Sequence, residues 1–190
     1  GNDFILLDNR ENIYSNISTK QVNFLCHRRF GVGADGLMML NNKPGFDFEM
    51  KYFNADGNES SMCGNGARCL IKFASMLGIK KSKYLFSAVD GVHEGEIDFN
   101  KEVRLKMKDV KGVEYSYTHY ILNTGSPHYV KSVRDVMQVD VVEEGRAIRY
   151  SKEFEEEGIN VNFVEVLDDD TIYVRTYERG VEEDTVSCGT

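Results

Sequence analysis

An internal duplication constrains the fold of this chain more strongly than any other feature of its sequence. Two segments share the spacing from a tyrosine to a cysteine–glycine pair, and they run from Tyr52 to Cys63 and from Tyr177 to Cys188. The shift between the two cysteines is 125 residues. Two further pairs of segments match at shifts of 125 and 124 residues: Gly33–Leu37 with Gly158–Asn162, and Gly1–Asn2 with Gly125–Ser126. Three matches at almost the same shift indicate two copies of one unit.

The duplication divides the chain into a unit of residues 1–118, which carries Cys63, and a unit of residues 119–190, which carries Cys188. The first copy continues for roughly 60 residues beyond its cysteine before the second begins. The second copy stops two residues after its cysteine. We therefore expect the second unit to be incomplete at its C-terminal end and the natural protein to be longer.

The spacing of apolar residues predicts strands and helices in each unit. Apolar residues recur at helical spacing from Ser18, which is the expected N-cap, to near Gly31. They do so again from Cys63 to Gly78. Strand patterns lie at 4–8, 46–52, 103–107, 161–167 and 172–177, with a hairpin turn at 168–170. These elements predict an α+β fold of two pseudo-symmetric units, each with a mixed or antiparallel sheet wrapped around a central helix. Because the helix after Cys63 has apolar residues on several faces, we expect it to be mostly buried.

Composition argues against several classes of partner and site. Phosphate backbones and anionic lipids attract clustered Lys and Arg, so the net charge of -8 argues against nucleic acid and membranes as partners. No segment approaches the ~20 apolar residues of a membrane helix and no signal segment opens the chain, so we expect a cytoplasmic location. The four cysteines show no Cys-x-x-Cys spacing, which argues against zinc. Cys26 and Cys69 are expected in the core.

Cys63 lies where a glycine-rich turn enters a helix. Amides at a helix N-terminus favour an anion, so we expect the pKa of this thiol below its reference of ~8.5 and a substrate carboxylate near the same amides. A small buried thiol at a tight turn is the alternative. The duplication places Cys188 in an equivalent turn, and two thiols on opposite sides of one carbon can act as base and acid. Inversion of a stereocentre by proton transfer requires that arrangement.

The chain resembles the diaminopimelate epimerases in three motifs. The motifs are Asn54-Ala55-Asp56-Gly57 with Cys63-Gly64-Asn65-Gly66-Ala67-Arg68-Cys69, Tyr177-Glu178-Arg179-Gly180 with Cys188-Gly189-Thr190, and Gly1-Asn2-Asp3-Phe4. The resemblance implies an isomerase of lysine and peptidoglycan-precursor biosynthesis that interconverts LL- and meso-diaminopimelate. It also implies a homodimer that uses neither a cofactor nor a metal ion.

The same resemblance assigns roles to individual residues. Cys188, as a thiolate, would take the α-proton of the LL isomer while Cys63 protonates the opposite face, and the roles exchange in reverse. His128 and Glu178 would support this pair. The implied substrate-binding residues are Asn2, Asn54, Gly64, Asn65, Asn160, Glu178, Arg179, Gly189 and Thr190. Among them, the amides at Gly64–Asn65 and Gly189–Thr190 would hold the reacting carboxylate, and Arg179 the distal one.

Two positions depart from the family pattern. Gly36 stands where members often have Gln, which removes one substrate contact, and Ser126 stands where many have Asn, although a hydroxyl can still form a hydrogen bond. A further hypothesis concerns redox state: two thiols that share one carbon are close enough to form a disulfide in the empty enzyme.

Other functions remain open at this point. Proline and hydroxyproline racemases are the nearest enzymatic alternative, but the second amino-acid head of diaminopimelate needs polar groups such as Glu178, Arg179, Asn54 and Asn160. A protein that binds an amino acid without exchanging its α-proton is the alternative from another class. Isomerases of the phenazine branch lack the cysteine pair. A thiol hydrolase is disfavoured because neither cysteine has a recognisable histidine base.

Overall fold

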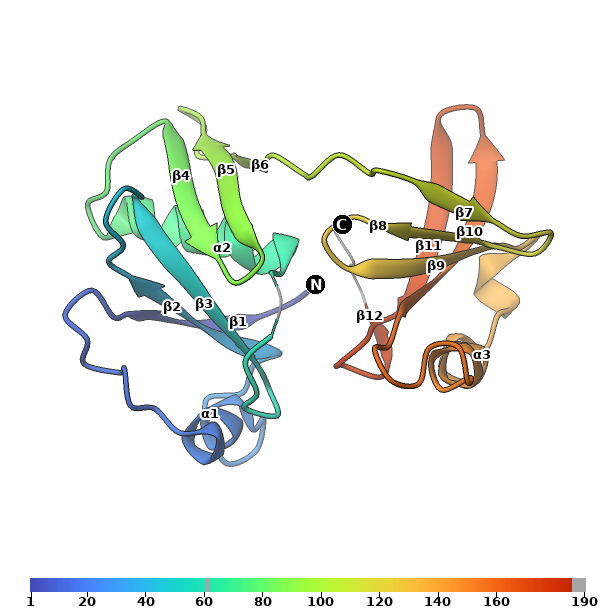
Figure 1. Cartoon of the computed structure of the whole chain (residues 1–190), viewed down its shortest axis with the longest axis horizontal. Helices are drawn as coiled ribbons and strands as arrows, with labels where there is room; N and C mark the ends of the chain where they lie inside the picture. Colours follow the sequence, from blue (N-terminus) through green and yellow to red (C-terminus); the bar gives the residue numbers. More distant parts are fainter. Residues whose placement is uncertain (61, 186–190) are drawn as a thin grey trace. The chain divides into compact units, whose positions relative to one another are not determined.

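The computed structural model describes residues 1–60 and 62–185 (Figure 1). The predicted site residues Cys188, Gly189 and Thr190, and with them the start of any second central helix, lie outside the described residues. The chain forms two compact units, an N-terminal unit of Asn2–Lys106 and a C-terminal unit that begins at Met107. An α+β fold with two six-stranded sheets confirms the predicted fold class.

The N-terminal unit contains one mixed sheet and two helices. Its sheet follows chain order from β1 to β6, with β1 and β2 parallel, β3 and β4 parallel, and the other neighbours antiparallel. The elements are β1 (Phe4–Asp8), α1 (Thr19–Cys26), β2 (Gly36–Asn41), β3 (Phe48–Asn54), α2 (Gly64–Met76), β4 (Lys83–Ala88), β5 (Gly91–Ile97) and β6 (Val103–Leu105).

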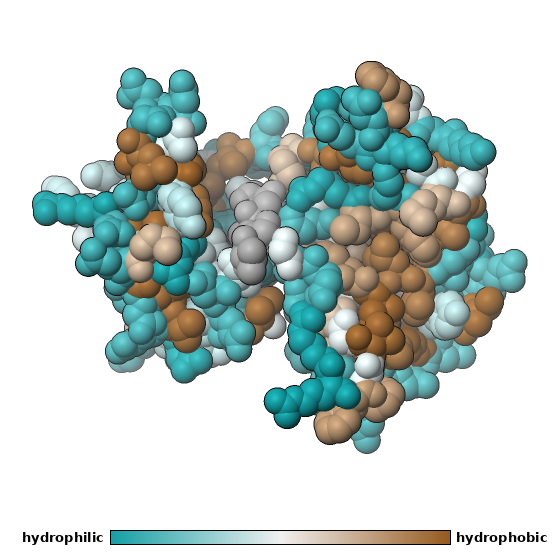
Figure 2. Space-filling view, turned by 180° about the vertical axis from the view of Figure 1, so that it is seen from behind, coloured by the Kyte–Doolittle hydropathy of each residue, from teal (hydrophilic) through white to brown (hydrophobic). Residues whose placement is uncertain are grey.

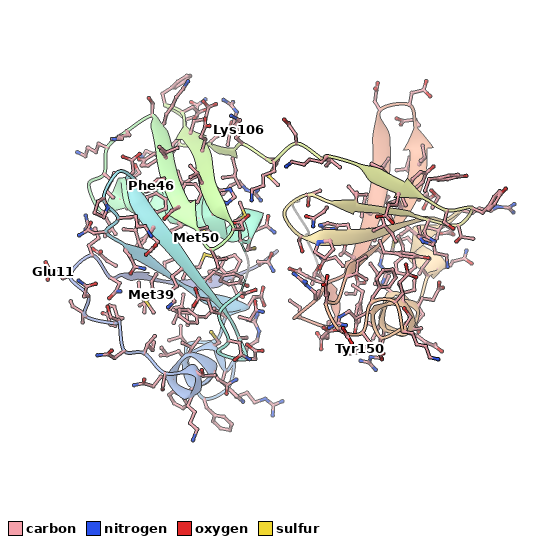
Figure 3. The ribbon with its side chains drawn as sticks, in the orientation of Figure 1. Glu11, Met39, Phe46, Met50, Lys106 and Tyr150 are labelled. Carbon is pink, nitrogen blue, oxygen red and sulfur yellow. The ribbon has the colours of Figure 1, made fainter. Side chains whose placement is uncertain are left out.

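Each face of this sheet is covered by one helix, because successive side chains of a strand point to opposite faces. On β2, Met38 and Leu40 pack with α2, whereas Leu37 and Met39 pack with α1. Figure 3 labels Met39 and Met50, which belong to the two different clusters. The central helix of the N-terminal unit is therefore α2, as predicted.

The C-terminal unit contains the second sheet, whose strand order is β12-β11-β10-β9-β8-β7. Strands β9 and β10 are parallel and the other neighbours are antiparallel. The elements are β7 (Val113–Tyr115), β8 (Tyr120–Asn123), β9 (Pro127–Ser132), the short 3₁₀ helix η1 (Val136–Gln138), α3 (Val141–Arg149), β10 (Asn160–Asp168), β11 (Thr171–Tyr177) and β12 (Asp184–Thr185). The boundary predicted after residue 118 falls between β7 and β8. Helix α3 packs on Val161, Phe163 and Tyr177.

Strand pairing supports the duplication. In the N-terminal unit Phe4 pairs with Gly36 and Leu37 pairs with Phe53. In the C-terminal unit His128 pairs with Asn160 and Val161 pairs with Tyr177, each 124 residues after its counterpart. The strands thus repeat at the shift found for Gly1–Asn2, so the predicted match of Tyr52 with Tyr177 is wrong by one residue and Phe53 is the counterpart of Tyr177. The shift of 125 applies to the glycine turns before β2 and β10, where Gly33 and Gly158 both have positive φ.

The predicted start of α1 is confirmed, but its predicted end is wrong. Ser18 caps the helix and forms a capping box with Gln21, which satisfies amides at both positions. The helix ends at Cys26, well before Gly31. His27 leaves the helix with extended backbone angles, and the backbone amides of Val32 and Gly33 both donate to the carbonyl of Leu25. The chain therefore folds back onto the last turn of α1, and Gly31 lies against the carbonyls of Phe24 and Leu25.

The predicted burial of α2 is wrong for one of its faces. The side chains of Ala67, Leu70 and Ile71 are buried, but Cys69 is exposed and Met76 is 76% exposed. Cys69 is therefore not a core residue, whereas Cys26 is buried as predicted. Apolar residues on several faces do not ensure burial, because only one face of α2 meets the sheet.

Two predicted strands are shorter than their sequence patterns. Strand β3 begins at Phe48 because Asp47 leaves the ladder of β2 and instead bonds Leu85 through its backbone amide and its carboxylate. Strand β6 ends at Leu105, before Met107. Figure 2 shows hydrophobic areas on a largely hydrophilic surface in both units. Within the described residues, no helix is both long and apolar enough to cross a membrane.

Candidate functional site

The Cys63 turn starts helix α2. Cys63 is half-buried and is the N-cap, with extended backbone angles of φ -114 and ψ 119, and its sulfur does not cap the helix. Its carbonyl accepts from the amide of Ala67 at 2.8 Å. The first amides of a helix have no acceptor within the helix, so this turn directs N–H groups toward the space beside the thiol. That geometry suits a carboxylate.

Gly66 allows this helix N-terminus to lie close to the sheet. A Cβ at this position would overlap the terminal methyl group and sulfur of Met38 on β2. The side chain of Phe4, at the start of β1, approaches the same point. Glycine therefore lets the Cys63 turn lie close to β2 without displacing the end of the Met38 side chain.

Asn2 and Asn65 connect the start of β1 to this turn. The Nδ2 amide of Asn65 donates to Oδ1 of Asn2 at 2.8 Å, and Nδ2 of Asn2 donates to Oδ2 of Asp35 at 2.9 Å. Arg68 donates in turn to Oδ1 of Asn65. The structure thus brings together the predicted residues Asn2 and Asn65, two positions from Cys63.

An ion-pair network holds the Asp35 end of this chain of contacts. Arg28 binds Asp3 through two hydrogen bonds of 2.9 Å and contacts Asp35 at 2.6 Å. Hydrogen bonds from Arg28 hold the pKa of Asp3 below its ordinary value. The sequence prediction missed these residues as site supports, although Asp3 lies in a motif that carried the resemblance and Asp35 lies in the repeated segment Gly33–Leu37.

Gly36 and Asn54 face each other across β2 and β3. A Cβ on Gly36 would come within 2.5 Å of Cε2 of Tyr52 and 2.6 Å of the carbonyl oxygen of Phe53. The tyrosine ring therefore occupies the space that a glutamine at position 36 would need. Asn54 is half-buried at the end of β3, where its backbone amide donates to Asn58.

Asn160 organises the corresponding end of the C-terminal sheet. Its Nδ2 donates to Oγ of Ser126 at 2.8 Å and to the carbonyl of Pro127 at 3.2 Å, and its Oδ1 accepts from the backbone amide of Arg179 at 2.9 Å. The hydroxyl of Ser126 thus forms a hydrogen bond, as expected for a partial replacement of asparagine. Asn160 itself is buried and holds the turn that carries Glu178 and Arg179.

The guanidinium of Arg179 is partly buried beside a second arginine. Its Nη1 donates to the carbonyl of Glu157 at 2.9 Å. Burial, and then the positive charge of Arg149, lowers the pKa of Arg179. A cation held this way favours an incoming anion, because a carboxylate would offset both effects. Glu178, the residue before Arg179 in the chain, is half-buried.

His128 lies in a buried layer of polar side chains. It is 3% exposed, and Nδ2 of Asn162 approaches its Nδ1 at 3.1 Å. Oδ1 of Asn162 accepts from Oγ1 of Thr176 at 2.9 Å. Burial, and then Arg179, lowers the pKa of His128, whereas the Asn162 contact acts in the opposite direction. Asn162 and Thr176 were missed by the sequence prediction, although Asn162 follows Asn160 at the spacing that places both on one face of β10.

A surface cavity of about 500 Å³ lies elsewhere in the N-terminal unit, over β4, β5 and β6. None of the predicted site residues lines it. Apart from Lys83, its charged side chains are already paired, as Lys81 with Asp47, Arg104 with Glu96 and Lys106 with Glu94. It therefore lacks the convergent, uncompensated groups of a catalytic site. No cluster of His, Cys, Asp and Glu suited to a metal ion is found among residues 1–60 and 62–185.

Comparisons with known proteins agree with these features. The family model for diaminopimelate epimerase matches residues 1–113 and 120–190. The diaminopimelate epimerase of Flavobacterium psychrophilum is 48% identical over 190 residues, which are all of this chain and 74% of that protein. That of Chlorobaculum tepidum is 43% identical and is covered to 76% of its length, again with all of this chain matched.

Solved structures show the same fold at low identity. A phenazine biosynthesis protein of the PhzF family from Bacillus anthracis superposes on all of this chain and 71% of its own, with a TM-score of 0.65 at 16% identity. A hydroxyproline epimerase from Agrobacterium vitis superposes on 81% of this chain and 56% of its own, with a TM-score of 0.58 at 12% identity.

Proposed function

Because the chain belongs to the diaminopimelate epimerase family, we propose that it is an isomerase that interconverts LL- and meso-diaminopimelate, a reaction of lysine biosynthesis. The Cys63 turn carries this proposal. It joins a half-buried thiol to the N-terminus of α2, and the hydrogen bond between Asn65 and Asn2 anchors that N-terminus to β1. A thiol and a carboxylate-binding group side by side are what proton transfer at the α-carbon of an amino acid requires.

The proposed reaction moves one proton on and one proton off the α-carbon. The thiolate of Cys188 takes the α-proton and becomes a thiol, while the C–H electron pair stays on carbon. The thiol of Cys63 then gives its proton to the opposite face and becomes a thiolate. In the reverse direction the two cysteines exchange roles, so each isomer binds the opposite protonation state of the pair.

The amides at Gly64–Asn65 and Gly189–Thr190 are proposed to hold the reacting carboxylate, where negative charge builds up in the carbanion. No cofactor shares this charge in the proposed mechanism, so the site has to exclude water and present fixed donors. Lowering of the Cys63 pKa by the helix N-terminus stays a prediction of the same kind.

The distal amino-acid head of the substrate is proposed to bind the C-terminal unit. Arg179 would contact the distal carboxylate and Glu178 an ammonium group, with Asn160 and Asn54 as further polar contacts. Support comes from the position of Arg179, whose backbone is held by Asn160 and whose side chain is partly buried. His128 is proposed to support the thiol pair. We further propose a cytoplasmic homodimer.

The test follows the α-proton. The full-length protein is incubated with LL-diaminopimelate in deuterated buffer under reductant, and proton NMR records the α-proton signal and the meso isomer. We expect loss of the signal together with formation of meso-diaminopimelate, and an approximately 10³-fold lower rate for Cys63→Ala. Cys69→Ala is the matched control, since Cys69 is an exposed thiol on the same helix.

A folded wild-type protein that neither exchanges the α-proton nor forms meso-diaminopimelate would refute the proposal. Exchange with trans-4-hydroxyproline in its place would identify a racemase of cyclic substrates, and tight binding of diaminopimelate without exchange would identify a binding protein. Equal rates for Cys63→Ala and the wild type would remove the thiol from the mechanism.

A further inference from the structure

We propose that Asn162 is a positioning residue that holds His128 as the neutral tautomer protonated at Nε2, so that His128 serves the reaction as a hydrogen-bond donor and not as a base. The proposal rests on the proposed epimerase function for its catalytic meaning. Its structural part, the tautomer, stands on contacts within the C-terminal unit alone.

Two partners other than His128 fix the orientation of the Asn162 amide. Its Nδ2 lies 3.1 Å from the carbonyl oxygen of Tyr129, and its Oδ1 lies 2.9 Å from Oγ1 of Thr176. A backbone carbonyl only accepts, so the NH₂ end of the amide has to face Tyr129. The hydroxyl of Thr176 then donates to the remaining oxygen. A flipped amide would place two acceptors against each other.

This orientation determines the state of the His128 ring. The same Nδ2 lies 3.1 Å from Nδ1 of His128, and it can only donate. Nδ1 therefore has to be the unprotonated nitrogen, and a neutral ring then carries its proton on Nε2. An imidazolium would place an N–H of the ring against an N–H of the amide. A hydrogen bond donated by the ring to Asn162 would raise the pKa of His128, but the amide orientation set by Tyr129 and Thr176 excludes that direction. Burial of the ring and the positive charge of Arg179 disfavour the imidazolium as well.

The N-terminal unit shows that the sheet does not need this arrangement. The residue 124 positions before Asn162 is Met38, and the residue 124 positions before His128 is Phe4, and both pack in the apolar core around α2. The polar pair is thus specific to the C-terminal sheet. A buried layer of hydrogen-bonded side chains is costly unless every group is satisfied, which favours a role in the site over a role in packing.

A ring in this state can donate from Nε2 to a thiolate or a carboxylate, and it cannot take a proton at Nδ1 while Asn162 donates there. Aspartate at position 162 would reverse the pattern, because a carboxylate only accepts and would hold a proton on Nδ1. Asparagine at this position therefore makes His128 a hydrogen-bond donor, whereas the histidine of a hydrolytic triad is oriented by a carboxylate and acts as a base.

The tautomer is measured directly by long-range ¹H–¹⁵N correlation spectra of the protein labelled with ¹⁵N-histidine. The sequence has four histidines, and the signals of His128 are identified by their loss in His128→Gln. We expect an unprotonated Nδ1 and a protonated Nε2 in the wild type near neutral pH. In Asn162→Asp we expect a protonated Nδ1. Asn123→Asp adds the same charge to an exposed position on β8 and should leave the wild-type pattern unchanged.

Activity is the second readout. Asn162→Asp should lower kcat about 100-fold with a much smaller change in KM, because the donor is lost and the binding groups remain. A protonated Nδ1 in the wild type, or an unchanged tautomer in Asn162→Asp, overturns the proposal whether or not the protein epimerises diaminopimelate. A confirmed tautomer in a protein that shows no exchange would instead refute the proposed function, so the two failures are distinguishable.

Discussion

The two sheets pair their strands in the same way but differ in the side chains at three matched positions. At three positions 124 residues apart, the side chains of the N-terminal sheet pack in the apolar core around α2, and the corresponding side chains of the C-terminal sheet are polar and hydrogen-bonded. The matched residues are Phe4, Met38 and Tyr52 in the first sheet and His128, Asn162 and Thr176 in the second.

This difference shows that strand pairing and side-chain chemistry are specified separately in this fold. Pairing of β1, β2 and β3 recurs in β9, β10 and β11, although the residues at three matched positions of this face have changed class. The apolar layer supports the Cys63 turn by packing, through Met38 and Gly66. The polar layer orients a histidine. One duplicated scaffold therefore supplies packing in one unit and hydrogen bonding in the other.

Exchanging one residue between the layers should have the largest effect. Met38→Asn places an amide at a fully buried position among apolar side chains, and it should lower the free energy of unfolding by about 4 kcal/mol. Asn162→Met removes the partner of Thr176 and the donor to His128, and it should cost about 2 kcal/mol. Urea denaturation measures both. Similar losses of unfolding free energy in the two variants would mean that the two layers tolerate a change of side-chain polarity equally.

Gly36→Gln tests the position two residues before Met38 on the same face of β2. Its counterpart 124 residues later is Asn160, which fits because Thr176 stands where the first sheet has Tyr52. The new side chain would overlap Tyr52 and the carbonyl of Phe53, so we expect a loss of about 2 kcal/mol in unfolding free energy.

Adding Tyr52→Thr to that variant should recover only part of this loss, because the backbone carbonyl of Phe53 remains in place. Thermal unfolding of the single and double variants measures the coupling. An undiminished stability of Gly36→Gln would show that Tyr52 does not close this space.

The pH dependence of stability should differ between the two sets of matched residues, since His128 has Phe4 as its counterpart. Burial lowers the pKa of His128 below the ~6.5 of an unfolded histidine. The unfolded chain therefore binds more protons as the pH falls below about 6.5, and this group's contribution to stability decreases there, by at most about 1.4 kcal/mol per pH unit. At higher pH the contribution is complete. Denaturation midpoints are measured for the wild type and His128→Gln from about pH 7.5 to about pH 5, a range that brackets the reference pKa of histidine. The midpoint should fall less steeply with decreasing pH in the variant than in the wild type.

Ser126→Ala should have the smallest effect. It removes one acceptor of the Asn160 amide, while the carbonyl of Pro127 still accepts from the same group. We expect a loss of about 1 kcal/mol in unfolding free energy. We also expect a modest rise in KM for diaminopimelate, because Asn160 holds the backbone of Arg179. A large fall in kcat would instead indicate that Ser126 takes part in the chemical step.

Local patterns predicted much of this fold, and long-range contacts explain what they missed. The bounds of β1 and the cap at Ser18 follow from residues that are adjacent in sequence, and so does the hairpin between β10 and β11. The exposed face of α2 does not, because it depends on where the sheet ends. Asn162 and Thr176 meet only through strand pairing, and the contact of Arg28 with Asp35 needs the loop after α1.

The order of strands in the first sheet bears on how the protein is made. Strands β1 to β6 are neighbours in the sheet in the order in which they occur in the chain. The last strand of this sheet therefore leaves the ribosome before any strand of the second sheet does. The N-terminal unit can close its core during translation, which keeps its strand edges from pairing with the similar strands that follow.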